Sequence, residues 1–182
     1  MTGVELQVVE DAAVGASVLE RIGALFDAEY QAEHGPWERR APYGYAPADI
    51  RVLAFDGTGL IGHVGYQRRT VGVGDREVTV AGVGGVLVAP RARGLGLGIA
   101  MLRRAQGRMA SDVDYGYLGC RPAVVPFYEA AGWRRIRARE HSLSPATGSP
   151  VTTNTDPILI CDAGRPASEW PAGTIDLRGL PW

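Results

Sequence analysis

Three glycines at alternate positions, Gly94, Gly96 and Gly98, follow an expected strand and open an expected helix. The first backbone N–H groups of a helix have no internal partners, and glycines leave them uncovered, so an anion can lie directly on them. Arg91 and Arg93 stand just before or within the turn and can add charge-assisted hydrogen bonds to a phosphate. The stretch therefore predicts a cradle for a pyrophosphate group.

Two widespread phosphate-binding motifs do not describe this stretch. It lies in the middle of the chain, and no acidic residue stands on a second parallel strand about twenty residues further on, as a dinucleotide-binding fold requires. The chain also has no Gly-Lys-Ser/Thr sequence, which excludes a Walker loop. The turn therefore belongs to another class of phosphate-binding segment.

The stretch Arg93-Gly94-Leu95-Gly96-Leu97-Gly98 matches the Gln/Arg-x-x-Gly-x-Gly/Ala signature of the Gcn5-related N-acetyltransferase (GNAT) superfamily. A later sequence, Phe127-Tyr128 followed by Gly132-Trp133, resembles a second segment of that superfamily, and the resemblance covers residues 50–142. It implies an α/β (α+β) fold. A mixed, mostly antiparallel central sheet would be splayed between its fourth and fifth strands and flanked by helices.

The resemblance also implies acetyl-CoA as the co-substrate, with no metal. The pyrophosphate would lie on the backbone of residues 93–98, and the pantetheine arm would pair with the strand that ends at Val88. Gly84 and Gly85 interrupt that strand and suggest a bulge, which is where the splay would begin. The implied cofactor-binding residues are Val86, Leu87, Val88, Arg93, Gly94, Leu95, Gly96, Leu97 and Gly98.

Tyr128 is the candidate catalytic residue. It occupies the position that, in many relatives, protonates the departing CoA thiolate. A thiolate leaving group gains from a nearby proton donor, so this role makes physical sense. The alternative is that Tyr128 merely packs beside Phe127.

Two groups within the superfamily share further features with this chain. It resembles the aminoglycoside 2′-N-acetyltransferases in His63, in a late loop with the acidic Asp156, and in the final Trp182. In that group the terminal Trp and its carboxylate reach the substrate. Residues 169–174 are similar to the tail of the nodulation N-acyltransferase, which acylates a glucosamine oligosaccharide. Both groups modify an amine on a sugar.

This chain departs from the aminoglycoside enzymes at the position of their catalytic base. The aminoglycoside enzymes carry a glutamate where this chain has Gly84, so the base comes from elsewhere or deprotonation proceeds through water. His63 is one alternative, although a lone His on a strand is more often structural. The other candidates, which we also expect to bind the amine, are Glu33, Glu38, Asp156 and the carboxylate of Trp182.

Length and composition predict one domain over residues 1–182, with a Pro-, Gly- and Trp-rich tail at 164–182. The resemblance to the aminoglycoside enzymes implies that this tail contributes to the substrate site. A net charge of −1 disfavours a nucleic-acid partner, and no apolar run approaches the about 20 residues of a membrane span. The N-terminus does not resemble a signal peptide, so we expect a cytoplasmic protein. Two cysteines are too few for a disulfide scaffold or a zinc site. The resemblance adds a homodimer as an expectation.

The charges are unevenly distributed along the chain. Residues 1–50 carry nine acidic side chains and three Arg, whereas residues 91–139 carry ten Arg and three acidic side chains. The distribution fits a site that binds an anion through the middle of the chain and a cation through its ends, or merely solvated faces. All 19 basic residues are Arg, so a catalytic lysine is excluded.

Hydrophobic periodicity and turn residues indicate the elements. A first helix is expected to begin at Asp11, and the Pro- and aromatic-rich segment 33–47 is expected to be irregular, its rings either lining a cleft or capping the core. Residues 144–155 are expected to form a loop. Strands are expected at 6–9, 51–55, 60–73, 78–88, 115–120, 134–142 and 157–161, and further helices at 99–109 and 122–131.

These observations predict an enzyme that transfers an acetyl group from acetyl-CoA to a primary amine of an aminoglycoside or related aminosugar compound. The first alternative is N-acylation of another small amine, a peptide or a glucosamine oligosaccharide. An alternative of a different class is a non-catalytic module that senses CoA or sequesters an antibiotic. Turnover separates the classes, because a sensor binds CoA but releases none.

Overall fold

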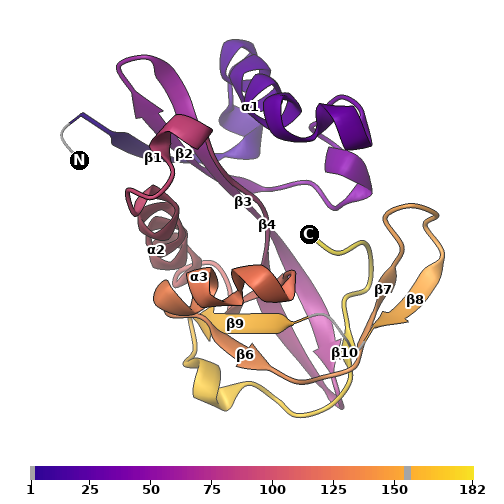
Figure 1. Cartoon of the computed structure of the whole chain (residues 1–182). Helices are drawn as coiled ribbons and strands as arrows, with labels where there is room; N and C mark the ends of the chain where they lie inside the picture. The colour runs from indigo at the N-terminus through magenta and orange to yellow at the C-terminus, as the bar shows by residue number, and fades with distance from the viewer. Residues whose placement is uncertain (1–2, 154–156) are drawn as a thin grey trace.

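The computed structural model describes residues 3–153 and 157–182, which build one mixed sheet flanked by helices (Figure 1). The helices are α1 (Ala16–His34), α2 (Leu97–Met109) and α3 (Val125–Ala130). None of the helices described is long and apolar enough to cross a membrane. The strands are β1 (Glu5–Glu10), β2 (Ile50–Asp56), β3 (Gly59–Val73), β4 (Arg76–Val88), β5 (Tyr115–Gly119), β6 (Arg134–Ile136), β7 (Glu140–Leu143), β8 (Pro150–Thr153), β9 (Ile158–Asp162) and β10 (Ile175–Asp176).

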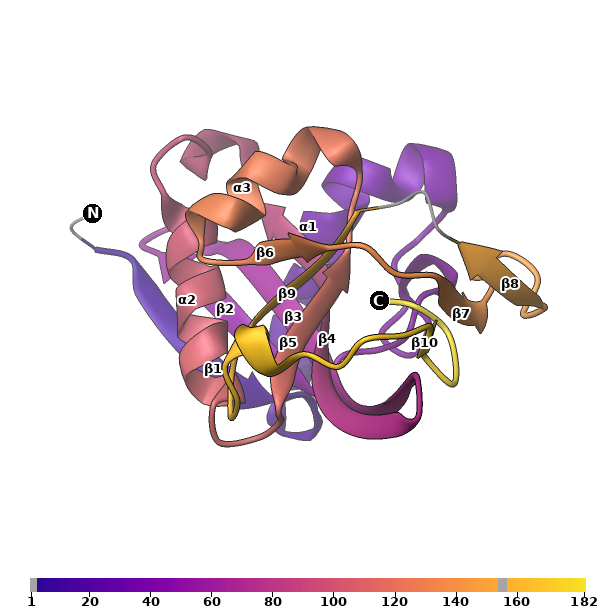
Figure 2. The ribbon, with the colours of Figure 1, turned by 90° about the horizontal axis from the view of Figure 1, so that it is seen from below.

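The described strands follow the order β6-β9-β5-β4-β3-β10-β7-β8, and β2 joins β1 to β3. Among the strand pairs of residues 3–153 and 157–182, only β4–β5 and β7–β10 are parallel. The expectation of a mixed, mostly antiparallel sheet with flanking helices is therefore confirmed. Figure 2 shows the sheet from below, with α2 and α3 on one side of it and α1 behind.

The two faces of the sheet carry separate parts of the core. Val52 and Ala54 of β2 pack with the buried face of α2, whereas Leu53, between them, packs with Ile22 and Phe26 of α1. This follows from the alternation of side chains along a strand. Because both faces are covered, β2 is apolar from Val52 to Phe55 instead of alternating.

The first helix begins later than expected. Residues Asp11–Ala13 form a short 3₁₀ turn, and α1 starts at Ala16 after Gly15. The Asp11 carboxylate does not cap the helix, because it accepts hydrogen bonds from Arg39 and Arg51. Ile22 and Phe26, four residues apart, give the buried face of α1.

The splay of the sheet is present at the expected place. The parallel β4–β5 pairing covers only Val80–Gly82 against Tyr115–Tyr117, although β4 continues to Val88. The β3–β4 register jumps from the pair His63–Leu87 to the pair Gly65–Gly84, so β4 carries an extra residue there. Gly85 has a φ of 60°, a conformation that favours glycine. The predicted bulge is thereby confirmed.

The single strand expected at 134–142 is two strands. β6 pairs with β9, whereas β7 pairs with β8 and β10, and residues 137–139 connect them. Ile136 and Ala138 keep the apolar alternation across this connection, so the pattern alone shows no break. The loop expected at 144–155 contains strand β8, which its Ser-, Thr- and Pro-rich composition concealed.

The tail returns to the sheet. β10 lies between β3 and β7, and beyond it Leu143 N–H donates to the carbonyl of Gly179 at 2.9 Å. Near the end, Ala46 N–H donates to the carbonyl of Pro181 at 2.9 Å. The tail therefore joins the segment after α1 to the β7–β8 hairpin and brings Trp182 over the centre of the sheet (Figure 1).

Candidate active site

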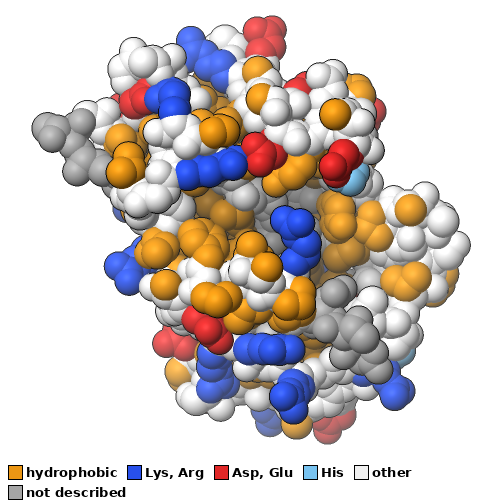
Figure 3. Space-filling view, viewed as in Figure 1, with side chains coloured by type: hydrophobic (Ala, Val, Ile, Leu, Met, Phe, Trp, Pro, Cys, Tyr) orange, Lys and Arg blue, Asp and Glu red, His pale blue; other side chains and the backbone are white. Residues whose placement is uncertain are grey.

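A groove of about 1250 Å³ runs along the splay, and we call it the transfer groove. The ends of β4 and β5, the glycine-rich turn, α1, α3 and the β7–β8 hairpin line it. Figure 3 shows this face as a hollow between α1 and α3 with largely hydrophobic walls. It is lined by all but one of the sequence-predicted cofactor residues, namely Val86, Leu87, Val88, Arg93, Gly94, Gly96, Leu97 and Gly98. Leu95 is the exception, because its side chain is 63% exposed on the outside of the turn.

The glycine-rich turn leaves its amides open. Gly94 and Gly96 have φ values of 76° and 77°, and no atom lies within 4 Å of a Cβ built on either residue. Gly96 is the N-cap of α2 and has no side chain to cover the first N–H groups of that helix. Gly98 serves packing, since a Cβ there would be 2.9 Å from Phe127 of α3. An anion therefore has room on this turn.

The two arginines of the turn are engaged differently. Arg93 donates to Glu29 of α1 at 2.7 Å and to the carbonyl of Val88 at 2.8 Å, beside the transfer groove. Arg91 instead pairs with Asp56 and Thr58 in the β2–β3 turn and is not among the groove residues. Arg93 is thus placed to reach a phosphate, whereas the guanidinium of Arg91 lies on Asp56, away from the lining of the groove.

Tyr128 lines the transfer groove from α3, beside Cys120. Its ring contacts Phe127, with ring centroids 5.0 Å apart. The same ring therefore packs beside Phe127 and lines the groove. Burial, the nearby Cys120 and Tyr30 raise the pKa of Tyr128 well above its usual range. The phenol therefore keeps its proton at neutral pH and can donate it into the groove.

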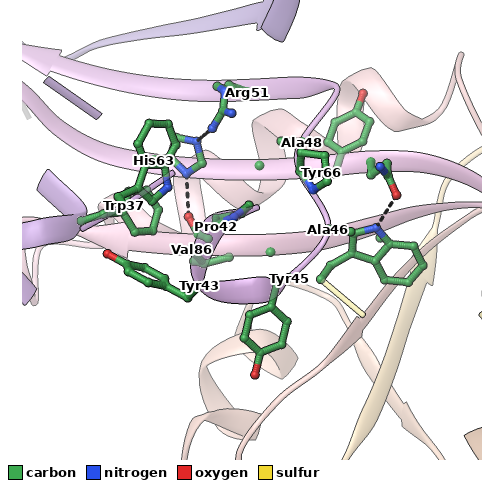
Figure 4. A pocket seen from close by; sticks show the side chains of 18 of the residues that line it. Trp37, Pro42, Tyr43, Tyr45, Ala46, Ala48, Arg51, His63, Tyr66 and Val86 are labelled. Carbon is green, nitrogen blue, oxygen red and sulfur yellow. Dashed lines mark hydrogen bonds between the residues drawn. The ribbon is translucent and has the colours of Figure 1, made fainter. Parts of the chain in front are cut away.

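A second cavity of about 280 Å³ lies against the α1 side of β3 and β4, and we call it the aromatic pocket (Figure 4). Its walls include the aromatic residues Phe26, Tyr30, Trp37, Tyr43, Tyr45, Tyr66 and Trp182. No aspartate or glutamate is among its described lining residues. The rings of the irregular segment after α1 thus line a cleft, which was one of the two sequence-based alternatives.

The two cavities share a wall. Tyr30, His34, Tyr45, Val86 and Trp182 line both of them. Val86 follows directly on the bulge, at the point where β4 has lost its pairing with β5. A molecule in the transfer groove and one in the aromatic pocket can therefore approach each other at Val86.

His63 lies at the floor of the aromatic pocket and is only 2% exposed. Both ring nitrogens have partners, the carbonyl oxygen of Gly85 and the guanidinium of Arg51. Burial and the charge of Arg51 lower the pKa of His63 to about 3. The imidazole is therefore neutral and has no free nitrogen, which argues against its role as the base.

The expected amine-binding residues are not gathered in one pocket. Glu33 lines the transfer groove from α1, and Glu38 is exposed and lines neither cavity. Asp156 lies outside the described residues. Trp182 lines both cavities, and its indole N–H donates to Gln67 at 3.1 Å.

Sequence reasoning missed one buried carboxylate. Glu140 of β7 lines the transfer groove, is 8% exposed and accepts a hydrogen bond from Tyr117 of β5. Its charge raises the pKa of Tyr117 further above the range set by burial. The pattern around Glu140 looks like ordinary strand alternation, so only the pairing of β7 with the tail reveals its position.

The fold and the splayed groove define the structural class of this protein. The crystal structure of the GNAT family N-acetyltransferase YhbS from Escherichia coli in complex with CoA superposes with a TM-score of 0.62 at 16% identity, covering 96% of this chain and 89% of that chain. Escherichia coli ElaA gives 0.58 at 16% identity, over 86% and 97%. The chain thus has the GNAT fold.

A family model narrows the class further. The model described as Nodulation protein A (NodA) matches residues 12–180, so the chain belongs to the NodA family. Nodulation protein A of Bradyrhizobium elkanii is 28% identical over 156 residues, covering 80% of this chain and 74% of the relative. That of Methylobacterium nodulans is 30% identical over 155 residues, covering 80% and 72%. Family and fold together make the chain an N-acyltransferase.

Proposed function

We propose that the protein transfers an acyl group from acyl-CoA directly to a primary amine on a sugar compound. The observation that carries this proposal is the shared wall at Val86, where the transfer groove and the aromatic pocket meet. Direct transfer needs donor and acceptor to reach one point from two sides. No covalent intermediate on the protein is required.

The transfer groove suits acyl-CoA. The open N–H groups of the turn at residues 93–98 and the guanidinium of Arg93 would hold the pyrophosphate. The part of β4 at Val86–Val88 lies beyond the β5 pairing, so its backbone would pair with the pantetheine arm as with another strand. This arrangement delivers the thioester to the bulge.

In the proposed reaction the amine nitrogen attacks the thioester carbonyl carbon. A C–N bond forms, the C–S bond breaks and the sulfur leaves as a thiolate, which takes a proton from Tyr128. The proton lost by the amine passes to water, and the phenol is reprotonated from solvent. The high pKa of Tyr128 keeps it in the donor form before each turnover.

The aromatic pocket favours an acceptor with few charges. The C–H faces of a sugar ring pack well on aromatic rings, and the described lining includes no Asp or Glu side chain for a polycation. We therefore place a glucosamine-type oligosaccharide with a single free amine ahead of an aminoglycoside. One observation supports the aminoglycoside as a second candidate: acidic Glu29 and Glu33 line the transfer groove from α1.

The test is CoA release from acyl-CoA donors of increasing chain length against a panel of glucosamine oligomers, aminoglycosides, polyamines and short peptides. We expect the highest kcat/KM with a glucosamine oligomer. A higher value with an aminoglycoside would reverse the order of the two acceptors. CoA binding without release across the panel would contradict the proposal and favour the sensing or sequestering module. Tyr128→Phe is the matched control, because it keeps the ring and removes the proton donor.

A further inference from the structure

The carbonyl oxygen of Gly85, at the bulge in β4, is held by a side chain of β3. Nδ1 of His63 lies 2.7 Å from this oxygen, and Nε2 lies 2.8 Å from Nη1 of Arg51 (Figure 4). A guanidinium offers only donors, so Nε2 must accept and the ring proton must be on Nδ1. His63 therefore donates to Gly85, and Arg51 fixes the tautomer that can do so.

Arg51 is itself held in place. It is 3% exposed, its Nε donates to Asp11 at 2.6 Å, and its guanidinium lies 5.6 Å from the ring centroid of Trp37. The second oxygen of Asp11 accepts from Arg39 at 2.9 Å. A continuous chain of hydrogen bonds thus runs from Asp11 through Arg51 and His63 to the backbone of β4. Such outer partners set the orientation and tautomer of an imidazole.

Glycines and one aromatic ring closely surround the imidazole. A Cβ on Gly85 would be 3.3 Å from Nδ1 and Cε1 of His63, and one on Gly65 would be 3.1 Å from Cε1. On the other side, the ring of Phe26 meets the imidazole edge-on, with centroids 5.1 Å apart. The imidazole therefore has one orientation available to it.

Because His63 holds the Gly85 carbonyl, it also sets the direction of the N–H group in the peptide that joins Gly85 to Val86. A trans peptide is planar, and its C=O and N–H groups point in opposite directions. The Gly85 carbonyl points toward His63 on β3, so the Val86 N–H points away from β3, toward the side from which β5 has separated. Val86 also lies on the wall that the two cavities share.

We propose that His63 is a positioning residue for acyl transfer: by holding the Gly85 carbonyl, it aims the Val86 N–H at the thioester carbonyl oxygen. This inference rests on the proposed function. A fixed N–H donor stabilises the negative charge that develops on that oxygen when the amine attacks. In this role His63 acts through the backbone of β4 and exchanges no proton.

The kinetic test compares His63→Leu, which removes the donor, with His63→Asn, whose amide N–H can donate from near the Nδ1 position. Ile22→Ala is the control, since it truncates a buried side chain in the same α1-side core, outside both cavities. We expect His63→Leu to lower kcat roughly a hundredfold with little change in the Kd for CoA. His63→Asn should recover most of kcat, and Ile22→Ala should lower Tm without lowering kcat. Retention of kcat in His63→Leu, or an equal loss in Ile22→Ala at matched Tm, would overturn the inference.

A binding measurement separates this inference from the proposed function. The probe is a ketone analogue of acetyl-CoA, with a methylene between sulfur and a ¹³C-labelled carbonyl, which binds but cannot transfer its acyl group. We expect its carbonyl resonance to move downfield on binding to the wild type and to His63→Asn, but not to His63→Leu. If that pattern holds while no amine is acylated, the proposed function fails and the positioning role stands. If the shift is the same in His63→Leu, the positioning role fails even in an active enzyme.

Discussion

The indole of Trp182 lies directly against Gly82 of β4: a Cβ built on Gly82 would be 2.0 Å from the ring. The guanidinium of Arg69 also stacks on this indole, with its carbon 4.3 Å from the ring centroid. Because Gln67 also accepts the indole N–H, Trp182 is held on β3 and β4 by ring packing, charge and a hydrogen bond. A glycine at position 82 provides the space for this ring.

Gly82→Ala should therefore displace Trp182 and disturb the shared wall of the two cavities. We expect KM for the amine to rise roughly tenfold, about 1.4 kcal/mol, with a smaller change in KM for acyl-CoA. Steady-state kinetics with each substrate varied in turn measures this split. The double variant Gly82→Ala/Trp182→Ala should show strong non-additivity, because removal of the ring removes the clash. Gly107→Ala, at an open position in α2, is the control and should leave both KM values unchanged.

A substitution in the glycine-rich turn should have the opposite effect on the two KM values. Gly96→Ala forces a side chain onto a residue with a φ of 77° and covers the first amides of α2. We expect KM for acyl-CoA to rise while KM for the amine stays nearly constant, with about 1 kcal/mol lost in stability. Gly148→Ala is the matched control, because it has a φ of 68° and open space but lies in the β7–β8 connection. A similar rise in both variants would show that strain alone, and not the phosphate site, is responsible.

Tyr128→Phe should lower kcat by roughly a hundredfold while leaving CoA affinity unchanged. The raised pKa of Tyr128 keeps the phenol protonated throughout the range from pH 6 to 10. The wild-type profile of kcat against pH should therefore show no decline from Tyr128 deprotonation within that range. A decline near pH 9 that disappears in Tyr128→Phe would contradict both the pKa shift and its cause, which is chiefly burial.

His63 should contribute a pH dependence to stability rather than to catalysis. Its pKa is about 3 in the folded protein, because burial and the charge of Arg51 outweigh the hydrogen bond to Gly85 and the charge of Asp11, and about 6.5 when unfolded. Between these values the unfolded chain binds the extra proton, so this contribution is complete above pH 6.5 and is lost as pH falls toward 3. Relative to His63→Asn, the wild type should lose up to about 1.4 kcal/mol of unfolding free energy per pH unit in that window. Urea unfolding at pH 7 and pH 5 checks the sign, and an equal slope in both proteins would refute it.

Local features of the sequence predicted which residues line the transfer groove. The glycine-rich turn is a short motif with its own backbone requirements. Gly84–Gly85 marked the bulge because adjacent glycines weaken a strand and permit the positive φ that a bulge needs. The resemblance to the GNAT superfamily, carried by the short segment around it, singled out Tyr128. These features depend on residues that are neighbours in sequence, so the sequence alone is enough to predict them.

The acceptor side depends on segments that are distant in sequence. Phe26 of α1, Tyr43 of the following segment and Trp182 of the tail meet only after the tail has entered the sheet. A two-residue strand such as β10 has no recognisable periodicity, and the role of Arg51 depends on Asp11 rather than on its neighbours in β2. The expected amine pocket of Glu33, Glu38, Asp156 and the carboxylate of Trp182 did not include these long-range aromatic contacts.

The β7–β8 hairpin reaches the rest of the described sheet only through β10, that is, through Ile175 and Asp176. The links across that short strand include the bond from Ile175 N–H to Arg139 and the bond from Leu177 N–H to His141. Small cooperative units held by few backbone bonds open first in amide hydrogen exchange. The hairpin should therefore exchange together with the tail, and earlier than β2 to β4. The wall of the transfer groove that the hairpin forms would then open as a gate, while the glycine-rich turn at the other end of the groove stays in place.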